Sequence, residues 1–175
     1  MSISIKEHTA TIETSEKYAE DELGNRYRYL LKRTWDKEKN IATVIMLNPS
    51  KADILKSDKT ITSLMNYLID NNYGSMIVVN MFSYMSTDPK ELKNKKDEFE
   101  ALNNKYIIEA SEKADDIIIA WTRENFINKK REVEFIIKSY KNKLKCFRDN
   151  KGRVGRHPRD LGQGWELVDY NFKYI

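Results

Sequence analysis

The chain has 175 residues, of which 40% are hydrophobic and 33% charged, a composition that indicates a single globular domain spanning 1–175. It contains no apolar run approaching the ~18 residues of a membrane span, no apolar leader, one cysteine and two histidines. These features exclude a disulfide framework and a Cys-rich or three-His metal centre. They predict a cytoplasmic protein with no membrane partner, no metal and no cofactor.

The positive charge is concentrated in one segment. Lysines and arginines number 31 against 27 acidic residues, which gives a net charge of +4. Residues 141–159 hold eight basic side chains and one acid, Asp149, so this segment alone carries +7. We expect it to meet the phosphate of a nucleotide or nucleic acid, and a solvated lysine-rich surface is the alternative.

The first 35 residues predict an antiparallel strand pair. Segments 3–12 and 26–35 have strand-like composition and alternation, and the sequence 21–25 between them supplies turn residues. A further stretch at the C-terminus, 165–174, predicts an edge strand.

Between these ends, buried strands alternate with amphipathic helical patterns. Continuous apolar runs at 41–47, 76–79, 117–120 and 144–147 have the length of buried strands, and helical apolar spacing occurs around 61–69, 99–107 and 133–140. Asp88 and Pro89 predict a capped helix start. The chain is therefore predicted to be an α/β single-domain three-layer sandwich with a mostly parallel central sheet, to which the N-terminal pair is added.

Polar, aromatic and cationic side chains follow each buried strand. Ligands of open parallel sheets bind beyond the carboxyl ends of the strands, so these residues are the candidate site. Side-chain amides suit the edge of a nucleobase and arginines suit phosphate, which predicts recognition of a nucleobase or nucleotide. The candidates are Asn48, Ser50, Asp53, Asp58 and Thr60 after the first buried strand, Asn80 and Tyr84 after the second, Trp121 and Arg123 after the third, and Arg156 and His157 after the fourth.

Several candidates have a purely structural alternative. Asn48 before Pro49 can simply turn the chain, and Ser50 or Asp58 can cap the next helix. Trp121 is the kind of residue that usually joins a core, and His157 in its basic loop fits a surface role as well as a functional one. The chain contains neither a dinucleotide-binding nor a P-loop glycine motif, so neither of those nucleotide sites is indicated.

The strand-end motifs form an ordered series. They are Met46-Leu-Asn-Pro-Ser-Lys-Ala-Asp53, Asp58-Lys-Thr60, Asn80-Met-Phe-Ser-Tyr84, Ala120-Trp121 and Gly155-Arg-His-Pro158. Over residues 26–158 the series resembles a family of bacterial and phage proteins that is catalogued as a domain of unknown function and marked by the motif M-L-N-P-S-x-A-D. Membership of that family implies no particular activity.

A more distant similarity connects the chain to the uracil-DNA glycosylase superfamily, in which Asn-Pro, a base-reading Asn and His-Pro follow in the order of Asn48-Pro49, Asn80 and His157-Pro158. This resemblance implies a uracil-DNA-glycosylase-like fold, with Asn80 on a pyrimidine edge and His157 stabilising charge on the departing base. It also implies that Asp53 or Asp58 orients the attacking water. Leu161 would be the wedge in the base stack.

Three functions follow from these expectations. The first is hydrolysis of an N-glycosidic bond in DNA or a nucleotide by Asp53 or Asp58 together with His157. The second is non-catalytic binding that sequesters a nucleotide or nucleotide-derived signal, as in phage or defence systems, through the same residues. The third is a protein-interaction module in which the basic segment meets an acidic partner.

Overall fold

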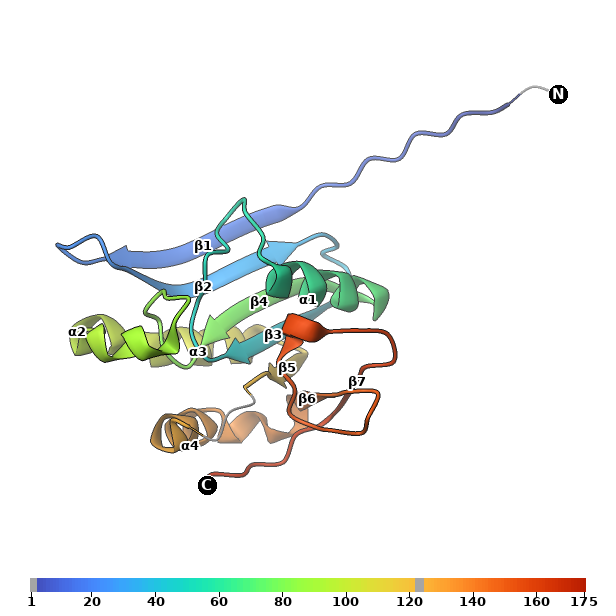
Figure 1. The fold of residues 1–175 in the computed structure, drawn as a ribbon. Helices are drawn as coiled ribbons and strands as arrows, with labels where there is room; N and C mark the ends of the chain where they lie inside the picture. Colours follow the sequence, from blue (N-terminus) through green and yellow to red (C-terminus); the bar gives the residue numbers. More distant parts are fainter. Residues whose placement is uncertain (1–2, 122–124) are drawn as a thin grey trace.

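The computed structural model describes residues 3–121 and 125–175, which form one mixed seven-stranded sheet flanked by four α-helices (Figure 1). The strand order across the sheet is β1-β2-β4-β3-β5-β6-β7. The strands are β1 (Glu13–Glu20), β2 (Arg26–Thr34), β3 (Asn40–Met46), β4 (Tyr73–Asn80), β5 (Asp116–Ile119), β6 (Leu144–Arg148) and β7 (Glu166–Asp169). The helices are α1 (Lys59–Asp70), α2 (Asp97–Glu100), α3 (Asn103–Lys113) and α4 (Ile127–Ile136), with 3₁₀ turns η1 (Pro89–Asn94), η2 (Lys138–Lys143) and η3 (Pro158–Asp160).

The four buried strands predicted from the sequence form the parallel part of the sheet. β3 pairs in parallel with both β4 and β5, and β5 pairs in parallel with β6. The other three pairings, β1 with β2, β2 with β4 and β6 with β7, are antiparallel. The expectation of a mostly parallel sheet is therefore corrected to a mixed one. A parallel crossover needs a dozen or more residues, whereas only 35–39 connect β2 to β3, so these two strands run in opposite directions on either side of β4.

The predicted N-terminal strand pair is present, but its first strand begins later in the chain than predicted. Residues 3–12 are exposed and extend away from the body of the molecule, and the strand begins only at Glu13 (Figure 1). Glu13 pairs with Thr34, the last residue of β2, so β2 offers no further backbone partner to the residues before Glu13. Ladder pairing, rather than the alternation of Ile3 and Ile5, decides where β1 starts.

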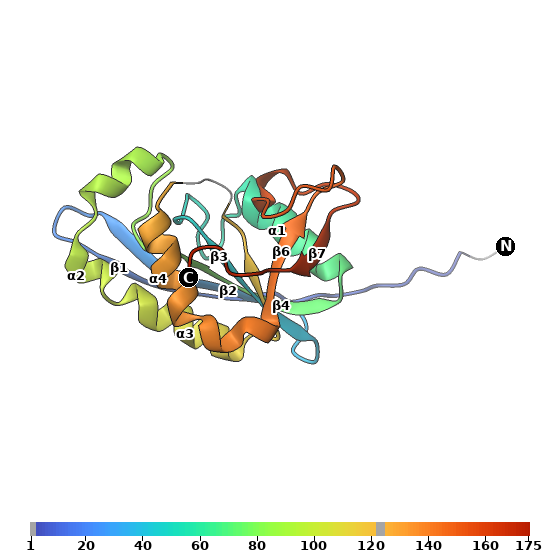
Figure 2. The ribbon, with the colours of Figure 1, turned by 90° about the horizontal axis from the view of Figure 1, so that it is seen from below.

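Alternate residues of the parallel strands face two separate hydrophobic cores. Ala42 and Val44 of β3 pack with Leu64 of α1, whereas Ile45 packs on the opposite face of the sheet with residues of α3 and α4. On that second face the Thr43 hydroxyl donates to the carbonyl oxygen of Ala110 at 2.8 Å. Figure 2 shows α1 on one side of the sheet and α3 and α4 on the other, which gives three layers.

The predicted cap at Asp88 is present, but the type of helix that follows it differs from the prediction. The Asp88 carboxylate accepts from the backbone N–H of Lys90, as predicted for a helix start, but the segment that follows is the 3₁₀ turn η1 rather than an α-helix. The predicted edge strand near the C-terminus is β7.

In the part of the chain that the structure describes, no helix has the length and apolar character needed to cross a membrane.

Candidate functional site

A cavity of about 630 Å³ opens at the carboxyl ends of β3 and β5. It lies where the loop after β3, the first turn of α1 and the basic loop before η3 meet, and α1 and η3 lie side by side in both Figures 1 and 2. Segments far apart in the sequence thus contribute to one concave surface. The lining comprises Arg28, 46–50, 58–61, Met81, 86–87, Trp121, Asn125, Lys130, 156–157 and 159–160.

Seven of the residues predicted from the strand ends line this cavity. They come from three places in the sequence: the segment after β3, the end of β5 and the loop after β6. The parallel strands bring them together because their carboxyl ends share one edge of the sheet. The seven are Asn48, Ser50, Asp58, Thr60, Trp121, Arg156 and His157.

Three further predicted residues lie outside the lining. The Asp53 carboxylate accepts from the backbone N–H groups of Leu55 and Lys56 at 2.8 and 2.7 Å, and these bonds lower its pKa. Asn80 is 1% exposed, and Tyr84 is buried with its ring edge against Tyr27 at a centroid distance of 5.3 Å. The remaining predicted residue, Arg123, lies outside the described residues.

Asp58 serves two local partners at the cavity wall. One carboxylate oxygen accepts from the backbone N–H of Ile61 at 2.8 Å and caps α1, and the other accepts from the Ser50 hydroxyl. The capping role that the sequence left open for Asp58 is therefore present, and the carboxylate also faces the cavity. Ser50 reaches Asp58 across the loop between β3 and α1.

Asn48 joins the loops that follow β3 and β4. Its Nδ2 donates to the carbonyl oxygens of Ser86 at 2.6 Å and Pro49 at 3.3 Å, and the N–H of Ser86 donates to the Pro49 carbonyl at 3.0 Å. Among the described residues no donor reaches Asn48 Oδ1. The amide therefore holds the cavity edge in shape and keeps one acceptor at its surface.

The His157 ring is oriented by the backbone at the start of η3. The backbone N–H of Arg159 donates to His157 Nδ1 at 3.1 Å, so a neutral imidazole carries its proton on Nε2. Pro158 follows at the first position of the turn and is buried. The ring is thus oriented by the backbone on one side and lines the cavity.

The basic segment 141–159 is spread over several surfaces. Lys145 pairs with Asp169 and Arg148 with Glu166 across β6 and β7, at 2.7 and 2.6 Å. Of its eight basic residues, Arg156 and Arg159 line the cavity. The +7 charge of this sequence segment is therefore not a single contiguous phosphate-binding surface.

Asp149 organises the loop that carries Arg156. It lies 2.7 Å from Arg153 Nη2 and 3.3 Å from Arg156 Nε, and it accepts from the backbone N–H groups of Lys151 and Arg153. Burial opposes the ionised form, but the hydrogen bonds from Arg153 and Lys151 outweigh it and lower the pKa of Asp149. A fixed anion behind the loop therefore sets the position of Arg156.

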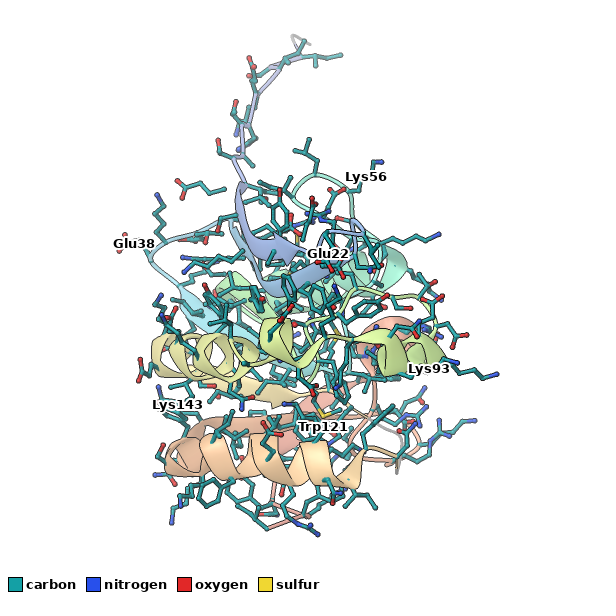
Figure 3. All side chains as sticks on the ribbon, turned by 90° about the vertical axis from the view of Figure 1, so that its left-hand side faces the viewer. Glu22, Glu38, Lys56, Lys93, Trp121 and Lys143 are labelled. Carbon is teal, nitrogen blue, oxygen red and sulfur yellow. The ribbon has the colours of Figure 1, made fainter. Side chains whose placement is uncertain are left out.

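Trp121 lies at the end of β5 with 6% of its surface exposed. Its ring meets that of Tyr170 edge-on at a centroid distance of 6.3 Å, and it packs in the core between the sheet, α3 and α4. Figure 3 shows Trp121 inside the molecule near α4, whereas Lys56 and Lys93 project outward. Trp121 is therefore both a core residue, as expected, and part of the cavity lining.

Three cationic lining residues, Arg28, Lys59 and Lys130, were absent from the sequence predictions, whereas Arg159 belongs to the basic segment 141–159 that was expected to meet phosphate. Arg28 and Lys130 lie within a strand and a helix, where reading only the strand ends could not find them. Both are almost completely buried, at 2% and 1% exposure. Lys59 lies between the predicted residues Asp58 and Thr60, and the abundance of lysine in the sequence gave no reason to single it out.

Among the described residues, the lining has five cationic side chains from β2, α1, α4 and the loop after β6, against the carboxylates of Asp58 and Asp160. This excess of three positive charges favours an anionic ligand. Within residues 3–121 and 125–175, no group of three or more His, Cys, Asp or Glu side chains is arranged to hold a metal ion.

Comparisons with known proteins give one match. No curated protein and no solved structure matches the chain. A family model described as "Protein of unknown function (DUF1643)" matches residues 28–159, which run from Arg28 in β2 to Arg159 in η3 and so include every cavity-lining residue except Asp160. Because the match covers well over half of the sequence, this chain belongs to the DUF1643 family.

Proposed function

We propose that this chain recognises a nucleotide or a closely related phosphorylated nucleoside in the cavity at the ends of β3 and β5. The observation that carries the proposal is the excess of cationic side chains in a cavity of about 630 Å³, within the range that holds small-molecule ligands. Arginine side chains such as Arg156 bind phosphate oxygens through paired donors.

The polar and aromatic part of the lining suits a nucleobase and sugar. Asn48 Oδ1 offers an acceptor, and the side chains of Thr60 and Thr87 offer hydroxyl groups. Trp121 adds an aromatic side chain to the lining. This combination supports a ligand with a flat polar ring and a charged end, rather than a simple inorganic anion.

A uracil-DNA-glycosylase-like arrangement is the finer form of the proposal. Its support is the four-stranded parallel unit β4-β3-β5-β6, with Asn48-Pro49 and His157-Pro158 at the same edge of the sheet. Asn80, the base reader implied by that similarity, does not line the cavity, so base recognition is assigned to the lining residues instead.

Hydrolysis of an N-glycosidic bond is the second candidate, and the shared cavity of Asp58 and His157 favours it. Such a reaction needs an oriented water and a donor that stabilises the charge on the leaving base. Asp58 would accept from the water and His157 Nε2–H would donate to the base. The Asp53 carboxylate is turned into its own loop, so Asp58 is the acid proposed for this role.

Calorimetric titration with a panel of nucleosides and their 5′-monophosphates tests the binding function. We expect the monophosphate to bind and Arg156→Ala to weaken it by about tenfold, a loss of one charge-assisted contact, while the matched nucleoside changes much less. Lys151→Ala is the control, because Lys151 is exposed in the same loop and does not line the cavity. Equal losses for nucleoside and nucleotide would contradict a phosphate contact at Arg156.

Asp58→Asn separates the enzyme from the binder. Asparagine preserves the helix cap but cannot act as a base, so an enzyme would keep its affinity and lose release of free base. Chromatography of nucleotide incubated with wild type and variant measures that release. Intact nucleotide with the wild-type protein would leave binding as the function.

A further inference from the structure

Arg28 is the most deeply buried arginine of the cavity lining. It lies near the start of β2, its exposure is 2%, and its guanidinium donates through Nη1 to the carbonyl oxygen of Ala52. An arginine this far from water normally has its charge matched by carboxylates and its donors by acceptors. Neither requirement is fully met here.

The counter-charge of Arg28 is shared. Glu16 is the one carboxylate within 4.0 Å of it among the described residues, and the same Oε1 atom lies 3.5 Å from Arg26 Nη2. Arg26 also pairs through its Nε with Glu20 at 3.3 Å, whereas the nearest carboxylate to Arg28 is the shared Glu16 at 4.0 Å, whose side chain is 6% exposed. The other carboxylates that act on Arg28, those of Asp58 and Asp53, lie beyond ion-pair distance, so no described carboxylate is in close contact with its guanidinium.

The donors of Arg28 are also incompletely used. Its Nε is buried and has no hydrogen-bond acceptor within the described parts of the chain. A planar guanidinium presents its donors as a fork that matches the oxygens of phosphate. An anion in the cavity would give the guanidinium a further acceptor and a counter-charge in direct contact.

We propose that Arg28 binds the phosphate together with Arg156 and that the ligand ends in a phosphomonoester, as a free nucleotide does, rather than in the phosphodiester of a nucleic-acid strand. A phosphomonoester carries about −1.5 to −2 at neutral pH, whereas each diester carries a single charge, so the monoester better matches the excess of positive charge in the described lining. This inference rests on the proposed function and adds the ligand's charged end to it.

Arg33 provides a matched control on the same strand. It is 6% exposed, its Nε is likewise buried without an acceptor, and it bonds the same loop through Ser57 Oγ at 2.5 Å and the Asp53 carbonyl at 3.2 Å. Arg33 does not line the cavity. Substitution of either arginine should disturb the loop, but only substitution of Arg28 should weaken the binding of an anion in the cavity.

The test compares Arg28→Lys with Arg33→Lys by calorimetric titration of a nucleoside 5′-monophosphate, its monoanionic methyl ester and inorganic phosphate. We expect Arg28→Lys to weaken the monophosphate and inorganic phosphate by about tenfold or more and Arg33→Lys by less than about twofold. Wild type should prefer the monophosphate over the methyl ester, and Arg28→Lys should reduce that preference. Equal effects of the two substitutions would overturn the proposal.

Glu16→Gln is a second variant that acts in the opposite direction. It removes the shared counter-charge from behind Arg28 while keeping an oxygen in place, so we expect phosphate affinity to rise by about threefold to tenfold. General disruption of the fold would lower affinity instead. If Arg28→Lys does not fold, unchanged or reduced affinity of Glu16→Gln for inorganic phosphate overturns the inference.

The outcomes separate this inference from the proposed function. If the monophosphate binds wild type and Arg28→Lys equally well, the function stands and the role of Arg28 is wrong. If inorganic phosphate binds through Arg28 but no nucleoside monophosphate binds more tightly than phosphate, the anion site stands and nucleotide recognition is wrong. If wild type binds neither, both are wrong.

Discussion

Asn48 spans the gap between two loops with one side-chain amide. Its Nδ2 donates to the Ser86 carbonyl, and the backbone of Ser86 returns a bond to Pro49, so the loops after β3 and β4 form a single cavity edge. The turn and the ligand roles are compatible in this residue because they use different atoms. Nδ2 donates to the protein, and Oδ1, which accepts from no donor among the described residues, is the atom proposed to contact a ligand.

Asn48→Ala should therefore lower both stability and affinity. We expect a loss of about 1 kcal/mol in the free energy of unfolding, the usual contribution of one hydrogen bond, together with weaker nucleotide binding. Urea denaturation and calorimetric titration measure the two effects. Unchanged stability would show that the bond between Asn48 and Ser86 contributes little in solution.

Gly74 lies where two backbone segments pack too closely for a side chain, whereas Gly162 has room for one. The carbonyl oxygen of Gly74 in β4 accepts from the backbone N–H groups of Trp35 and Asp36, which brings the turn between β2 and β3 directly against β4. A Cβ atom at Gly74 would lie 1.9 Å from the Asp36 carbonyl oxygen, a backbone atom that cannot turn away. At Gly162 a Cβ would meet no heavy atom closer than 3.8 Å.

At the level of this element, Gly74→Ala should open the junction between the antiparallel and parallel parts of the sheet. We expect it to lower the free energy of unfolding by about 1–3 kcal/mol, as overpacking usually does. Gly162→Ala, the matched control, should change it by less than about 0.5 kcal/mol. Thermal and urea unfolding give both values, and equal effects would argue against the close approach at Gly74.

The stability of the whole molecule should depend on Asp149 in acid. Its pKa is lower in the folded chain than the ordinary value of 3.8, so the unfolded chain binds the proton more readily. The stabilisation is therefore complete above pH 3.8 and is lost as the pH falls through the lowered pKa.

Asp149→Asn removes that dependence. We expect the free energy of unfolding of the variant to fall less steeply than that of wild type between about pH 5 and pH 2. Above that range the variant should be the less stable of the two, because Arg153 and Arg156 lose their fixed anion. Parallel slopes in urea denaturation across this pH range would contradict the prediction.

Much of the architecture was readable from local pattern. The four continuous apolar runs became β3, β4, β5 and β6, and the helical spacing around 61–69 became α1. Such runs must be buried on both faces, and this requirement leaves a parallel sheet between helices as the favoured arrangement. The prediction of a strand at 3–12 was wrong because an alternating pattern does not by itself supply a neighbouring strand to pair with.

The candidate site was readable only in part, for a related reason. Asn48, Asp58 and His157 follow strands or precede helices, where chain order predicts a common edge. Asp53 follows the same strand, yet its carboxylate bonds its own loop, and Asn80 ends β4 without lining the cavity. Side-chain direction within a loop depends on local hydrogen bonds that residue spacing does not encode.

By itself, the amino-acid sequence determined the class of fold, the parallel strands and the edge of the sheet at which the cavity opens, because burial and strand direction follow from hydrophobic pattern and connection length. Only the tertiary structure decided the charge of the cavity. Arg28 in β2 and Lys130 in α4 are separated by about a hundred residues and lie inside regular elements, and both line the same cavity. Charges at such distances along the chain meet only when the sheet and helices have packed.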